Sequence, residues 1–149
     1  MTRSKRMNPV VKVAESREQA AARILGEAQQ QLTRQEQRLD ELMAYRDQYS
    51  QQFQQSSGMG MGVARLQDYR VFLARLNEAI EQQKQVIVRC RQDCERQRCH
   101  WLSSRTRTQA LGKVVERYQR EERRAVERRE QHDSDERAQR PLLPDSDEH

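Results

Sequence analysis

The sequence predicts an all-α protein, a long antiparallel two-helix coiled-coil hairpin with an extended C-terminal helical overhang. Charged residues make up 34% of the 149 residues and aromatic residues only 5%, which is too little apolar material for the core of an ordinary domain of this size. All three prolines, Pro9, Pro141 and Pro144, lie near the ends of the chain. The long middle, rich in Gln, Glu, Arg, Ala and Leu, therefore contains no helix breaker and favours long solvated helices.

The first helix is expected over residues 9–55, after a disordered segment at residues 1–8. Asn8 is a suitable N-cap, and Pro9 suits the first helical position. Mostly apolar residues then recur with the heptad spacing that is typical of coiled coils. The a positions are Val11, Glu18, Leu25, Leu32, Leu39, Arg46 and Phe53, and the d positions are Ala14, Ala21, Ala28, Gln35, Leu42 and Tyr49.

A glycine-rich turn is expected at residues 56–62, because glycine tolerates the dihedral angles that let a chain reverse. A short turn makes the two helices antiparallel, so that a positions of one helix layer against d positions of the other. Two registers, one heptad apart, satisfy this condition. A turn centred on residues 60–61 favours the register that pairs Phe53 with Tyr69, Leu42 with Ile80, Leu32 with Cys90 and Ala21 with Trp101.

The second helix is expected over residues 63–137, with a disordered acidic tail at residues 138–149. From residue 117 onward Arg and Glu are the commonest residues of this helix, and their i,i+3 and i,i+4 pairs support a helix only weakly. Its a positions are Leu66, Leu73, Ile80, Ile87, Cys94, Trp101, Thr108 and Val115, and its d positions are Tyr69, Leu76, Gln83, Cys90, Gln97, Ser104, Leu111 and Tyr118.

The sequence does not read as that of an enzyme. It contains no phosphate-binding loop, paired-histidine metal helix or nucleophile elbow, and a two-stranded coiled coil offers no concave pocket for a substrate. We expect neither a cofactor nor a metal. The group Cys90, Cys94, Cys99 and His100 suggests a metal site, but Cys90 and Cys94 occupy seam positions, which favours packing over ligation.

A cytoplasmic protein is expected. The basic residues 1–7 are followed by an apolar run too short for a signal peptide, and no stretch approaches the roughly 18 apolar residues of a transmembrane helix. Any membrane association should therefore come through partners or through surface charge. Three clustered cysteines suit a reducing compartment better than a disulfide framework.

Two features of the second helix suggest binding surfaces. Basic residues greatly outnumber acidic ones from Lys84 to Lys113, which fits an acidic protein partner or a solvated face. Nucleic acid fits less well, because aromatic residues that would stack on bases are absent apart from Trp101, and none is expected as a partner. A second feature is a stripe at helical spacing in which Phe72 either anchors a partner or covers the edge of the hairpin. The stripe consists of Phe72, Leu76, Ala79 and Gln83.

Three stretches together resemble the family of the flagellar export protein FliJ: residues 21–27 (AARILGE), the glycine-rich turn, and residues 69–82 (YRVFLARLNEAIEQ). The resemblance implies a soluble component of the bacterial flagellar type III protein export apparatus, required for flagellum biogenesis and motility and similar to the stalk subunit of rotary ATPases. It implies binding to the export ATPase FliI, promotion of its ring assembly, contact with the export gate FlhA, and recycling of export chaperones. The implied location is the cytoplasmic side of the inner membrane at the flagellar base, reached through these partners.

The resemblance also indicates which residues of this sequence contact the partners. The gate-contacting patch of the family falls on Phe72, Leu76, Ala79 and Gln83, where Gln83 replaces a histidine found in some members. We further expect the free ends of the hairpin to enter the ATPase, where basic side chains could meet acidic loops. These side chains are Arg117, Arg120, Arg123, Arg124 and Arg128.

Two other functions stay open. A stalk protein of a related virulence type III secretion system would share the shape and the ATPase dependence but differ in substrates. A self-assembling coiled-coil scaffold would instead form parallel dimers. The glycine-rich turn favours a monomeric antiparallel hairpin over this second alternative.

Overall fold

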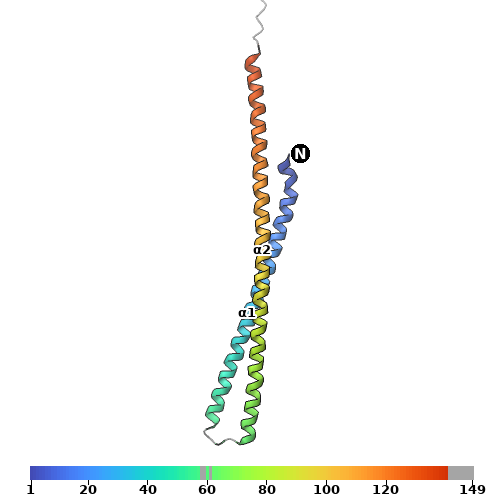
Figure 1. Cartoon of the computed structure of the whole chain (residues 1–149). Helices are drawn as coiled ribbons and strands as arrows, with labels where there is room; N and C mark the ends of the chain where they lie inside the picture. Colours follow the sequence, from blue (N-terminus) through green and yellow to red (C-terminus); the bar gives the residue numbers. More distant parts are fainter. Residues whose placement is uncertain (58–59, 61, 141–149) are drawn as a thin grey trace, which may run out of the picture. The chain divides into compact units, whose positions relative to one another are not determined.

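Two long helices account for the secondary structure of the computed structural model, which describes residues 1–57, 60 and 62–140 (Figure 1). Helix α1 covers Arg3–Ser57 and helix α2 covers Val63–Gln139, and no strand occurs in the described residues. The helices pack against each other, so the predicted all-α hairpin is confirmed. Contacts divide the chain into two compact units: a hairpin unit, Arg17–Ser104, and a terminal unit made of Met1–Ser16 and Arg105–His149.

The heptad pattern explains which side chains are covered in both units. Every a and d position predicted for the two helices is buried or half-buried. The fully covered members lie along one seam, Ala14 in the terminal unit and the others in the hairpin unit, where Ile80 is 1% exposed. These members are Ala14, Ala21, Leu76, Ile80 and Ile87, together with the polar Gln83. Neither helix, over its described residues, has an apolar stretch that could cross a membrane.

Close to the turn, the hairpin unit shows one of the pairings that the favoured register predicts. The rings of Phe53 and Tyr69 stack with centroids 3.6 Å apart, as that register requires. Farther from the turn, the side-chain amide of Gln83 donates to the main-chain oxygen of Gln35 at 2.9 Å and to its side-chain oxygen at 2.8 Å. The ring pair selects the favoured register, whereas Gln35 and Gln83 are both d positions that lie about one turn from direct pairing in either register.

The start of α1 differs from the prediction. Residues 1–8 are not disordered, because α1 begins at Arg3 and Pro9 lies inside it. Asn8 is therefore an interior helical residue, and Thr2 takes the position before the helix. Pro9 lacks a main-chain N–H and so removes one hydrogen bond from this helix, which the surrounding turns tolerate.

Thr2 caps the first turn of α1 with both its main chain and its side chain. The Thr2 carbonyl accepts a hydrogen bond from the N–H of Arg6 at 3.1 Å. The Thr2 hydroxyl Oγ1 accepts one from the N–H of Lys5 at 3.4 Å. A threonine hydroxyl bound to the third helical N–H is a usual N-cap arrangement, and it satisfies a donor that the helix itself leaves unpaired.

The connection between the helices is described only in part. The expected turn at residues 56–62 includes residues 58, 59 and 61, which lie outside the described residues. Gly60 has a φ of 79°, in the left-handed region that favours glycine. The Gly62 carbonyl accepts the first hydrogen bonds of α2. Of the expected tail, residues 141–149 also lie outside the described part.

Candidate partner-binding surfaces

Aromatic side chains gather at the end of the hairpin unit nearest the turn. Both phenylalanines and three of the four tyrosines of the chain take part. Tyr49 of α1 stacks on Tyr69 with centroids 5.3 Å apart and lies 4.4 Å from the ring of Phe72. Tyr45 meets Phe72 edge-on at 6.0 Å, and Tyr45 is still 50% exposed. Phe72 is therefore half-buried against α1 rather than free on the surface.

The four predicted gate-contacting residues divide into two pairs. Leu76 and Gln83 are buried in the seam at 8% and 7% exposure, and the amide of Gln83 is already bonded to Gln35. Phe72 and Ala79 are half-buried at its edge. Only Phe72 and Ala79 thus offer surface to a partner, while Leu76 and Gln83 hold this part of α2 against α1.

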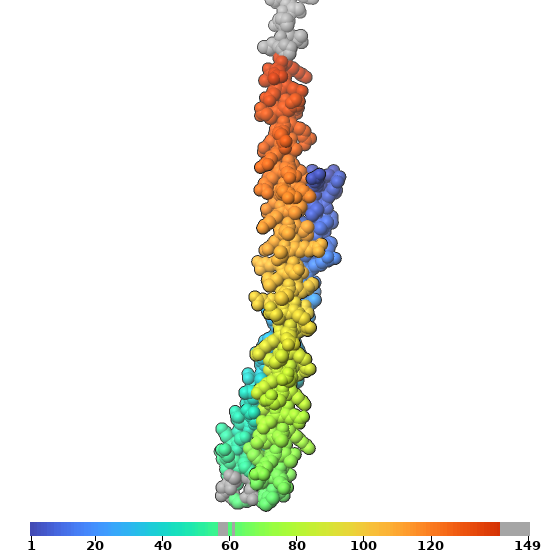
Figure 2. Space-filling view, viewed as in Figure 1, coloured from blue at the N-terminus to red at the C-terminus, as the bar shows by residue number. Residues whose placement is uncertain are grey.

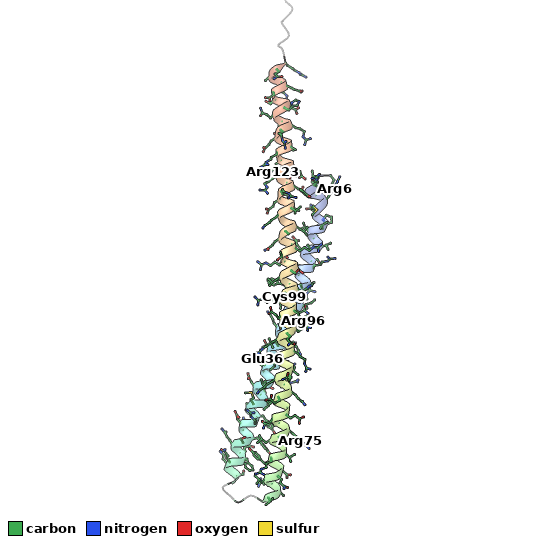
Figure 3. All side chains as sticks on the ribbon, viewed as in Figure 1. Arg6, Glu36, Arg75, Arg96, Cys99 and Arg123 are labelled. Atoms are coloured by element: carbon green, nitrogen blue, oxygen red, sulfur yellow. The ribbon has the colours of Figure 1, made fainter. Side chains whose placement is uncertain are left out.

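The five predicted ATPase-contacting arginines all lie exposed on α2 in the terminal unit. In Figure 2 the first residues of α1 lie along this part of α2, and α2 continues beyond them. The guanidinium of Arg117 lies over the ring of Tyr118 at 5.6 Å, and Arg3 of α1 lies over the same ring at 5.7 Å. Arg117 therefore lies beside α1, and Arg123 is level with the first turn of α1, because its neighbour Glu122 is bonded to Ser4. Figure 3 labels Arg123.

Four of these five arginines share one face of α2. At 3.6 residues per turn, Arg117, Arg120, Arg124 and Arg128 fall within an arc of about 80°. This arc lies opposite the seam residues Val115 and Tyr118, so it faces away from α1. Within the described residues none of the four forms an ion pair with a carboxylate. We call these four residues the arginine stripe; Arg123 lies about 100° away from its centre.

A contact between the two ends of the helices was not foreseen from the sequence. The carboxylate of Glu122 accepts hydrogen bonds from the Ser4 N–H at 3.0 Å and from the Ser4 hydroxyl at 2.8 Å. Ser4 is only 7% exposed. The signal was present, since Ser4 and Glu122 each continue the a series by one heptad beyond the predicted seam.

This contact places an anion at the N-terminus of α1, where unpaired N–H groups and the helix dipole favour negative charge. The main-chain N–H of Ser4 and then its hydroxyl lower the pKa of the Glu122 carboxyl. Partial burial opposes this shift, and the charge of Lys5 adds to it. Glu122 is therefore ionised at neutral pH and acts as a tertiary cap for α1.

The cysteines of the hairpin unit take different environments. Cys90 and Cys94 are half-buried at their seam positions, and Cys99 is exposed. Burial raises the pKa of the Cys94 thiol, and nearby Asp93, Cys90 and Glu36 raise it further. Among the described residues, no group of three or more His, Cys, Asp or Glu side chains is arranged to hold a metal ion.

Comparison with known proteins identifies the family. The model of the flagellar FliJ protein family matches residues 3–143, nearly the whole chain. No curated protein and no solved structure gives a significant match. The matched region includes both helices and all the candidate residues described above. The chain therefore belongs to the flagellar FliJ protein family and is an export-related coiled-coil protein of the flagellum.

Proposed function

We propose that this chain is a stalk-like, non-enzymatic component of the flagellar type III export apparatus. It binds the export ATPase FliI and promotes assembly of the ATPase ring, contacts the export gate FlhA, and returns export chaperones for new cargo. It works in the cytoplasm at the inner membrane of the flagellar base and reaches the membrane only through these partners. Membership of the FliJ family supports this role.

The observation that carries the ATPase contact is the arginine stripe. Arg120, Arg124 and Arg128 are exposed, lie on one face of α2, and have no carboxylate partner among the described residues. Exposed positive charge of this kind attracts an acidic surface and raises the rate of association at low salt. We therefore propose that this face contacts acidic loops of the ATPase. Arg117 is the first residue of the stripe along α2, and Arg123 is a flanking contact.

The gate contact is proposed for the edge of the hairpin unit. Phe72 and Ala79 present the surface that a gate segment would cover, next to the half-exposed ring of Tyr45. Leu76 and Gln83 belong to the same patch but act from beneath it, because both are buried against α1. Truncating Phe72 or enlarging Ala79 should weaken gate binding more than changing Gln83.

The ATPase proposal is tested by charge reversal on two faces of α2. The variant Arg120→Glu with Arg124→Glu changes the stripe, while Arg129→Glu with Arg137→Glu changes the same net charge at exposed positions of α2 outside it. ATP hydrolysis by the cognate export ATPase is measured with each protein and with the unaltered chain. We expect the stripe variant to need an about tenfold higher concentration for half-maximal stimulation of the ATPase. The control variant should need less than about twofold more than the unaltered chain.

Circular dichroism shows whether both variants keep their helices, which exposed substitutions should not disturb. Equal losses in the two variants would mean that net charge alone matters. Full stimulation by the stripe variant would contradict the assignment of this face to the ATPase.

Two alternatives are separated by the same assay. A stalk protein of a virulence secretion system would stimulate the ATPase of that system and not the flagellar one. A self-assembling scaffold would stimulate neither and would sediment as a stable dimer. The antiparallel contacts within the hairpin unit, such as that between Phe53 and Tyr69, favour the monomeric form.

A further inference from the structure

The two flanks of the hairpin unit differ in character. The e positions of α2 are polar and exposed, and the pair of Arg91 with Glu36 at 3.9 Å marks this flank. After Arg65, the next g positions of α2 are the apolar residues Phe72, Ala79 and Val86, and all three are half-buried. We call this second side of the hairpin unit the g flank.

Helix α1 contributes apolar surface to the g flank as well. Its g positions include Tyr45, which is 50% exposed and contacts Phe72, and Ile24, which is 44% exposed. A two-stranded coiled coil needs apolar residues only at a and d. An apolar face that also includes one flanking position is typical of helices with more than one neighbour. The g flank is therefore wide enough to take a third helix.

A groove of about 290 Å³ opens on the g flank, between the two helices. The small or apolar side chains of Ala28, Val86 and Cys90 line it. Two arginines, Arg89 and Arg96, line it too, together with Asp93. Figure 3 labels Arg96 on α2 within this part of the chain.

The charge of the groove is not balanced. Asp93 already lies 3.4 Å from the guanidinium of Arg96. Arg89, and also Arg38 at a g position of α1, form no ion pair within the described residues. A partner that covers the groove would remove these guanidinium groups from water, which is unfavourable unless it supplies carboxylates.

We infer that the g flank around this groove binds an acidic amphipathic helix of a partner protein. The binding region runs from Ile24 to Gln31 on α1 and from Val86 to Arg96 on α2, and the bound helix is the third strand of a local three-helix coiled coil. One apolar side chain of that helix enters the groove between Ala28 and Cys90. A carboxylate on its polar face pairs with Arg89.

Phe72, Ala79 and Tyr45, at the turn end of the g flank, stay assigned to the gate. The inference concerns the groove farther from the turn, whose lining residues take no part in the proposed ATPase and gate contacts.

The test uses the full chain and two designed peptides about three heptads long. Both carry Leu and Ala on one face; the first carries Glu on the other face, and the second carries Lys at those positions. Binding is measured by fluorescence anisotropy of a label on the peptide. The chain supplies a local reporter, because Cys90 lines the groove and Cys99 lies exposed outside it.

We expect the Glu peptide to bind and the Lys peptide not to bind. The bound Glu peptide should slow alkylation of Cys90, followed by mass spectrometry, and leave Cys99 unaffected. Arg89→Glu should weaken binding by about tenfold, because it turns an attraction into a repulsion. Arg98→Glu, an exposed change of equal charge on the other flank, should weaken it by less than about twofold.

Several outcomes would overturn the inference. These are no binding of either peptide, equal binding of both, an equal effect of the two variants, or binding that leaves Cys90 unprotected. Sedimentation of the chain alone provides the last check. Self-association that Arg89→Glu abolishes would assign the g flank to a second copy of this chain instead of an acidic partner helix.

Discussion

The buried amide of Gln83 offers the sharpest test of how the seam is stabilised. Gln83 is 7% exposed and makes two hydrogen bonds to Gln35. Each such bond contributes about 1 kcal/mol net. In Gln83→Leu both bonds are lost, but Gln35 is half-buried, so its side chain can turn to water, and its carbonyl keeps its place in the helix.

A leucine at this position would also fill the space between Ile80 and Ile87 with apolar surface. Replacing a buried polar group by an apolar one of similar size is often neutral or stabilising. We therefore expect Gln83→Leu to raise the free energy of unfolding by about 1 kcal/mol. Gln83→Ala leaves a gap as well as losing both bonds, and should lower it by about 2 kcal/mol.

The two variants and the unaltered chain are compared by urea unfolding, followed by circular dichroism at the helical band. The dependence of the free energy on urea should stay the same in all three, since the surface exposed on unfolding hardly changes. The reasoning is refuted if Gln83→Leu destabilises the chain by more than about 1 kcal/mol. Gate binding by Gln83→Leu should be unchanged, because this side chain faces α1.

Two further predictions concern single contacts. Phe72→Ala should lower the free energy of unfolding by about 2 kcal/mol, because it removes ring contacts with both Tyr45 and Tyr49. Urea unfolding measures this loss. An unchanged free energy of unfolding would show that these ring contacts contribute nothing to stability. The Ser4–Glu122 contact should persist above the ordinary carboxyl pKa and be lost as pH falls through the lowered pKa of Glu122, since protonation removes the acceptor charge. The amide chemical shift of Ser4 should report this acid-side transition, which should be absent in Glu122→Gln.

The fold could be predicted from the sequence because each step depends on local regularity. Heptad spacing assigns the covered face of each helix without any knowledge of the partner. The short glycine-rich connection then restricts the register to few choices, and the stacking of Phe53 on Tyr69 selects the expected one. The start of α1 was missed because its stabilisation comes partly from Glu122, far away in the sequence.

The candidate surfaces could be predicted only in part. The heptad already placed Leu76 and Gln83 at d positions, so their burial was foreseeable, but the contacts that cover Phe72 involve tyrosines of the other helix. Composition showed that the end of α2 is rich in arginine. Only the helical geometry separates the arginine stripe from Arg123, because neighbours in sequence point in different directions.

A core one seam wide also determines how stability is distributed. Each layer of the seam touches only the layers before and after it, as in repeat proteins, so its stability depends on nearest neighbours rather than on a common centre. A partner that binds the aromatic layer of Tyr49 and Phe53 would stabilise the adjacent layers strongly and the distant layers only weakly. Hydrogen exchange along the helices would then fall off with distance from the bound partner, and the gradient itself would locate the binding site.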